Sequence, residues 1–277
     1  MSRKSFSRIV SEIYDNSWGK AIILRNYLTD TKKSLDIFSK DSKTFVKIFG
    51  DMREYNEDTG IDESDLESEE ERDWYIITLD QQQLRRFNKE MRKHRVIVEH
   101  YPNMLMDMAF IYLVSLFDAY MVDIFAAVLN LRPETLKSSS KTLSYDKIID
   151  LMRDNKIISY LVQREINEIS YGSILEQNKY YQSRFNINLE GSGVGIDLLS
   201  EIKARRNIIV HNNGVVNAIY LQSVKNPVYK EGDRVDISVD YWNDSFTNLD
   251  IVAKYIKVSI INKFAKKSKS QLGPVKT

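Results

Sequence analysis

The apolar stretch Met104–Leu131 places the strongest constraint on what this chain can fold into. It contains no glycine or proline, and in a helix its apolar side chains would point to nearly every side. Asp107, Asp118 and Asp123 interrupt it, and each acid at the centre of a bilayer costs roughly 2.5–3.5 kcal/mol on insertion scales. The stretch therefore predicts the central helix of a bundle, in a cytoplasmic protein without a membrane partner.

Helix is also favoured elsewhere, because the 277 residues include only ten glycines and four prolines. Apolar periodicity predicts one or two helices within residues 5–49, and another over 79–100 that ends before Pro102. Further helices are expected at 145–155, 157–169, 173–181, 196–211 and 246–265.

Near the C-terminal end the period changes. Val235, Ile237, Val239 and Tyr241 alternate with polar residues, as in a half-buried strand, and residues 215–224 are the expected partner strand. The predicted fold class is therefore mainly α: a helical bundle with a small β-hairpin near its C-terminal end and an N-terminal helical extension.

The expected organisation has three parts: an N-terminal helical extension over residues 1–100, a main domain over 101–265, and a basic tail over 266–277. An acidic stretch at about 51–73 lacks apolar periodicity and is predicted to be a linker within the extension. The net charge is +1, yet basic residues cluster locally, as at 85–95, and such patches can hold a phosphate backbone. The lack of cysteine excludes thiolate metal sites and thiol nucleophiles.

The segment with the most chemical potential is Glu201-Ile-Lys-Ala-Arg-Arg-Asn-Ile-Ile-Val-His-Asn-Asn-Gly214. Asn207 and His211 are four residues apart and so share one face of the predicted helix, while Arg206 can reach round to them. The three side chains offer a phosphate-binding cation, a hydrogen-bonding amide and a group that exchanges protons near neutral pH.

This pattern resembles the motif of the HEPN family, in which an arginine is followed by a polar residue, three to five further residues and a histidine. Residues 113–124, an acid set among apolar residues, resemble the family's first core helix. The resemblance covers roughly residues 100–265. Arg95 and His100 have the same spacing, but valine follows that arginine where the family has a polar residue.

The resemblance implies a metal-independent endoribonuclease that needs no cofactor. His211 would exchange protons with the ribose 2′-hydroxyl or the leaving oxygen, and Arg206 would hold the scissile phosphate. Asn207 would orient either the histidine or the phosphate. The products would carry 2′,3′-cyclic phosphate and 5′-hydroxyl ends. Family members pair two copies of the motif, so the expected partners are RNA and a second copy that completes a composite active site.

Neighbouring polar residues are expected to support such a site. Asp118 and Asn212 are candidate supporting residues, Lys203 is a candidate RNA contact, and Arg205 is a candidate for both roles. A buried Asp118 needs a partner, either an arginine of the motif segment or a structural salt bridge. A toxin or antiviral defence effector, with a cognate antitoxin or other regulatory partner, is the biological role that fits.

Two other functions fit the same residues. The helix could serve a non-catalytic module that binds RNA, a nucleotide or a protein. Alternatively, the chain could be a structural adaptor that depends on residues 1–100. An enzyme requires Arg206 and His211 on one open surface, whereas an adaptor would tolerate their loss.

Overall fold

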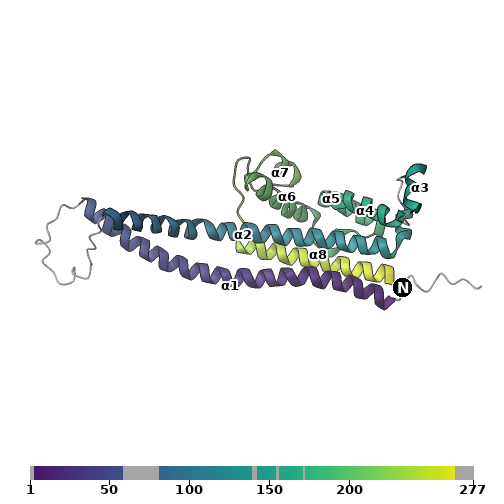
Figure 1. Cartoon of the computed structure of the whole chain (residues 1–277), viewed down its shortest axis with the longest axis horizontal. Helices are drawn as coiled ribbons and strands as arrows, with labels where there is room; N and C mark the ends of the chain where they lie inside the picture. Colours follow the sequence, from purple (N-terminus) through teal and green to yellow (C-terminus); the bar gives the residue numbers. More distant parts are fainter. Residues whose placement is uncertain (1–2, 59–80, 139–141, 154–155, 171, 266–277) are drawn as a thin grey trace, which may run out of the picture. The chain divides into compact units, whose positions relative to one another are not determined.

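The computed structural model describes residues 3–58, 81–138, 142–153, 156–170 and 172–265 (Figure 1). Contacts divide the chain into two compact units, one of residues 1–25 and 106–277 and the other of residues 26–105. The described residues are helical, as predicted: α1 (Arg3–Asp58), α2 (Gln81–Leu131), α3 (Tyr145–Arg153), α4 (Ile157–Ser170), α5 (Ile174–Phe185), α6 (Ile196–Asn212), α7 (Ala218–Ser223) and α8 (Val239–Ala265), with short 3-10 helices at Pro133–Ser138 and Leu189–Ser192.

The core of the first unit is built around the second half of α2. Leu113, Phe117 and Phe125 are fully buried there, as expected for a helix with apolar residues on nearly every side. α8 and the start of α1 run alongside it (Figure 1). The hydroxyl of Tyr120 donates to the Ala253 carbonyl at 2.9 Å, and the Trp18 ring packs edge-on to Phe117. Three helices therefore share one aromatic core.

The shorter helices cover another side of α2. From α5, Tyr181 donates its hydroxyl to the Met121 carbonyl at 2.7 Å and packs beside Phe125. Phe185 bridges Phe125 and Phe264, and so joins α5 to α2 and α8. These contacts hold α5 on α2 and α8, and α6 in turn packs against α5.

The stretch His100–Leu131 is long and apolar enough to cross a membrane by length and composition alone. Half of its most apolar window is buried inside the protein. The buried side chains are the ones that pack against α8, α5 and α1, so the same residues that raise the hydropathy form the core.

The predicted β-hairpin is wrong. The described residues contain no strand, only an isolated antiparallel bridge between Val215 and Arg234. Residues 218–223 form α7 instead, because the Asn217 side chain accepts from the Tyr220 backbone and caps a helix.

The second half of the predicted hairpin fails for a similar reason. Val235 and Ile237 are buried, so the two-residue period identified an extended segment with one buried side. The Ser238 hydroxyl then accepts from the backbone N–H of Tyr241 at 3.0 Å, and α8 begins at Val239. Because Ser238 caps a helix, Val239 and Tyr241, the second half of the alternating run, belong to α8 and not to a strand.

Two predicted boundaries also differ. α2 continues through Pro102, where a helix end was expected, although a proline inside a helix costs roughly 3 kcal/mol. The buried residues that hold this helix in the core begin at Ala109. The predicted linker at about 51–73 is helical over residues 51–58, since α1 extends to Asp58. The rest of that stretch up to Asp73, and the basic tail 266–277, lie outside the described residues.

Candidate functional site

The motif residues lie on the last turns of α6, which ends where its sequence predicts. Asn213 adopts the left-handed conformation with φ of 51°, and Gly214 follows with φ of 75°. Both are residues that tolerate positive φ and commonly end helices. Asn212, expected as a supporting residue, donates its side-chain amide to the Val215 carbonyl at 2.6 Å. Its contact holds the helix end in place, just beyond His211.

Arg206 is half-buried and is held from two sides. One terminal nitrogen, Nη1, donates to the side-chain oxygen of Asn207 at 3.0 Å, and the other, Nη2, donates to the Ser115 hydroxyl of α2 at 3.4 Å. Ser115 in turn donates to the Ile111 carbonyl at 2.7 Å. The enclosed Nε of Arg206 has no hydrogen-bond partner. Each terminal nitrogen carries a second N–H, so the guanidinium is fixed in direction while retaining donor capacity.

Asn207 and His211 are both exposed on α6, which confirms that the four-residue spacing puts them on one accessible face. Because Asn207 accepts from Arg206 through its oxygen, its amide nitrogen can still donate to a ligand. No described residue hydrogen-bonds the imidazole of His211. The structure thus brings Arg206 and Asn207 into contact and places His211 one turn further along.

Lys203 and Asp118 form an ion pair between α6 and α2, with 2.8 Å between Nζ and Oδ1. Lys203 also donates to the side-chain oxygen of Gln177 on α5 at 3.3 Å. Asp118, the acid in the middle of α2, is therefore paired with Lys203 and not with Arg205 or Arg206. Lys203 thereby connects α6 to both α2 and α5.

Arg205 points away from the motif face and is only 8% exposed. Its Nε donates to Glu201 at 2.6 Å, its Nη1 donates to the Asp236 carbonyl at 3.2 Å, and its Cζ lies 3.7 Å from the ring centroid of Tyr241. This geometry gives Arg205 a structural role in joining α6 to the segment that precedes α8 and to the start of α8.

The carboxylate of Glu201 is the centre of this buried cluster. It also accepts from the Tyr241 hydroxyl, and from the Tyr220 hydroxyl at 3.4 Å. Burial and the nearby carboxylate raise the pKa of Tyr241 well above its usual range, and for the same reasons the pKa of Tyr220 is raised to about 12. Both phenols therefore stay protonated as donors to Glu201 at neutral pH.

A small second core packs against α6. It consists of Ala204, Ile208, Val216, Tyr220, Val224 and Val235. Two members come from α6, three come from α7 and its flanking residues, and Val235 comes from the segment that precedes α8. This packing holds the motif helix between the main core and the α7 region.

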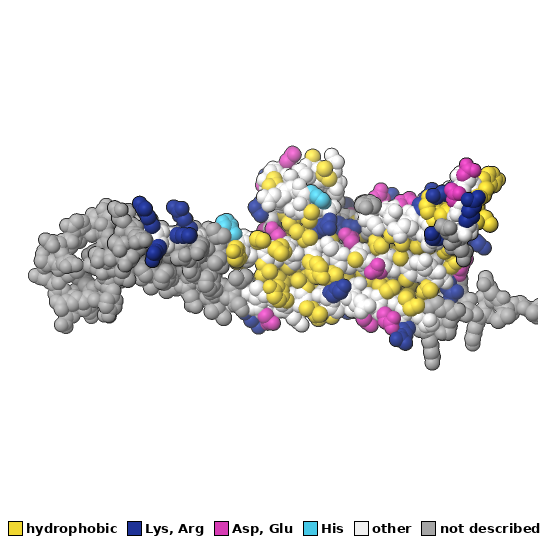
Figure 2. Space-filling model, viewed as in Figure 1, with side chains coloured by type: hydrophobic (Ala, Val, Ile, Leu, Met, Phe, Trp, Pro, Cys, Tyr) yellow, Lys and Arg dark blue, Asp and Glu magenta, His cyan; other side chains and the backbone are white. Residues whose placement is uncertain are grey.

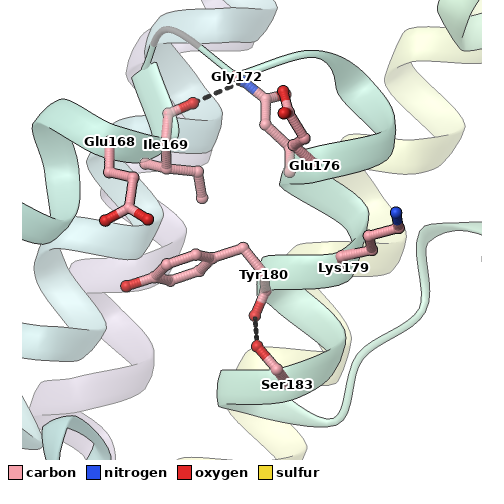
Figure 3. Close-up of a pocket in the computed structure, with 8 residues that line it drawn as sticks. Glu168, Ile169, Gly172, Glu176, Lys179, Tyr180 and Ser183 are labelled. Atoms are coloured by element: carbon pink, nitrogen blue, oxygen red, sulfur yellow. Dashed lines mark hydrogen bonds between the residues drawn. The ribbon is translucent and has the colours of Figure 1, made fainter. Parts of the chain in front are cut away.

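A pocket of about 510 Å³ lies between α4 and α5, away from the motif residues. Figure 3 shows the Tyr180 ring reaching toward the side of Glu168, with Gly172 and Glu176 at the turn between the helices. Tyr180 packs edge-on to Phe125, and its enclosed hydroxyl has no hydrogen-bond partner. The pocket touches the α6 network through one residue, Gln177, which binds Lys203.

One sequence signal would have found part of this arrangement. The four-residue spacing of Glu201 and Arg205 is that of a helical ion pair. No local signal points to Ser115, which is 91 residues from Arg206 in the chain. The described residues contain no group of three or more histidines and acids that could hold a metal ion.

Comparisons with protein-family models, with curated proteins and with solved structures found no match to this chain.

Proposed function

We propose that this chain is a metal-independent endoribonuclease of the HEPN type. One observation carries the proposal: the guanidinium of Arg206 is held between Ser115 and Asn207, and Asn207 shares an exposed face of α6 with His211. A fixed cation, an amide and an imidazole on one accessible surface are the groups that phosphodiester cleavage by an internal nucleophile requires.

In the proposed reaction, the ribose 2′-oxygen forms a bond to the adjacent phosphorus and the bond from phosphorus to the 5′-oxygen breaks. An imidazole takes the 2′-hydroxyl proton, and a protonated imidazole supplies a proton to the departing 5′-oxygen. Arg206 stabilises the negative charge that grows on the phosphate oxygens, and the amide nitrogen of Asn207 donates to one of them. The products are a 2′,3′-cyclic phosphate and a 5′-hydroxyl.

One imidazole has to accept a proton and another has to donate one, so the reaction uses two imidazoles. Each chain has one histidine, His211, on this face. A second copy would supply the other imidazole, and it would also supply contacts for a ring that no described residue hydrogen-bonds. Next to the site, α2 exposes Met108 and Tyr112, which are 56% and 47% accessible and lie seven and three residues before Ser115. Figure 2 shows hydrophobic side chains gathered along α2 and α8. An apolar surface beside the motif suits a homodimer with a composite cleft.

The test of the proposal is cleavage of purified RNA by Arg206→Ala and by a matched control, Lys225→Ala. Lys225 is an exposed lysine that pairs with Asp197 in the first turn of α6. We expect the loss of Arg206 to lower the rate by about 10²–10³, the usual effect of removing one donor that stabilises transition-state charge. The control should cleave like the wild type, and the products should carry cyclic phosphate ends.

The dimer is tested separately with Tyr112→Glu. Light scattering should show a shift from dimer to monomer, and activity should fall with it because the second imidazole is lost. Equal cleavage by Arg206→Ala and wild type would refute the catalytic assignment. RNA binding without any cleavage would instead favour the non-catalytic binding module.

A further inference from the structure

The early part of α2, in the unit of residues 26–105, carries exposed basic side chains that the motif does not use. Arg85, Arg86, Lys89 and Arg92 are all exposed. Arg85, Lys89 and Arg92 follow the spacing i, i+4, i+7, which places them on one face of a helix, and Arg86 lies about 100° further round. We call these four residues the basic face; Figure 2 shows basic side chains grouped over this part of α2.

The charge of this segment is one-sided in the sequence as well. Residues 81–100 contain six lysines and arginines and two glutamates, a net charge of +4 from 6 − 2, whereas the whole chain is +1. Positive charge concentrated in this way attracts a polyanion even when the protein is close to neutral.

We propose that the basic face is an RNA-binding surface that contacts the phosphate backbone of the substrate. This inference rests on the proposed function for the identity of the polyanion. One helical turn rises about 5.4 Å, so side chains at i, i+4 and i+7 are spaced to contact successive phosphates of an extended strand. Arginine and lysine bind phosphate regardless of base, so the face provides affinity without sequence preference.

The proposal is tested by binding of long single-stranded RNA to the full chain in a His211→Ala background, which keeps the RNA intact. The test variant changes Arg85, Arg86, Lys89 and Arg92 to Gln, a residue that also favours helix. The control variant changes four exposed basic residues outside the face to Gln: Lys137, Arg153, Lys179 and Lys230. Both variants lose four positive charges, so a general charge effect would weaken them equally.

Four lost contacts should lower the slope of log affinity against log salt by about 3, at roughly 0.7 per phosphate of a single strand. Near 0.1 M salt this corresponds to a loss of about two orders of magnitude or more in affinity. The control should bind within a few-fold of the background protein. Circular dichroism of each variant checks that the helix content is kept.

Cleavage separates this inference from the proposed function. In the active protein, the face variant should lose kcat/KM on long RNA but keep it on a dinucleotide, whose single phosphate occupies the motif. Unchanged RNA binding by the face variant, or equal weakening of the control, would overturn the inference even if RNA is cleaved. Loss of binding to anionic lipid vesicles but not to RNA would also overturn it. Face-dependent binding without any cleavage would support the inference while refuting the nuclease.

Discussion

Replacing Glu201 by Gln tests how the motif helix is held in place. In the pair with Arg205, the side chains of Arg205 and Glu201 are 10% and 15% exposed, and removing one partner of a buried ion pair costs about 3–5 kcal/mol. The amide oxygen of Gln can still accept from Arg205, which returns about 1 kcal/mol. The Asp236 carbonyl and the Tyr241 ring continue to contact the guanidinium. We therefore expect the free energy of unfolding to fall by about 3 kcal/mol.

Urea unfolding followed by circular dichroism measures this loss, with Asp197→Asn as the control. Asp197, which lies on the same helix as Glu201, pairs with Lys225, but these two side chains are 55% and 70% exposed, so the control should cost less than about 1 kcal/mol. If the two variants lose the same stability, the buried cluster does not hold α6, and the structural role assigned to Arg205 is wrong.

Three further outcomes follow from the same contacts. Phe117→Ala, at a fully buried position, should lower the free energy of unfolding by about 3–5 kcal/mol in the same urea assay; a loss below 1 kcal/mol would contradict its place in the core. The pKa of Tyr220 is raised in the fold, so the stability that its protonation provides is complete below pH 10 and is lost as the pH rises toward about 12. Tyr220→Phe should flatten that part of the profile, and parallel profiles would count against the contact with Glu201. Ser115→Ala should lower RNA cleavage by up to about tenfold, with Ser115→Thr retaining activity, because one hydrogen bond to Arg206 is lost; equal rates for all three proteins would remove Ser115 from the site.

The motif helix could be predicted because its signals are local. The apolar period from Ile196 onward and the Asn-Asn-Gly stop were enough to place α6 and its end. The shared face of Asn207 and His211 followed from their four-residue spacing, and the structure adds that both side chains are exposed. The buried helix within α2 was equally clear, since its apolar residues leave no polar side to face water.

The features that the sequence did not reveal depend on contacts between distant segments. Alternation in residues 235–241 suggested a strand, but the choice between strand and helix was decided by capping at Ser238 and by the absence of a partner strand in residues 218–223, which form α7. The contact of Ser115 with Arg206 and that of Tyr241 with Glu201 arise only when α2 and α8 are brought to α6. Pro102 is a further case, because α2 continues through this local helix-breaking signal into the segment that is buried in the core from Ala109 onward.

Cleavage of total RNA in EDTA by equal amounts of wild type and His211→Ala tests the central claim most directly. The account predicts that wild type cleaves the RNA and leaves 2′,3′-cyclic phosphate and 5′-hydroxyl ends, whereas His211→Ala leaves it intact. Cleavage of the same RNA at the same rate by His211→Ala would contradict the account.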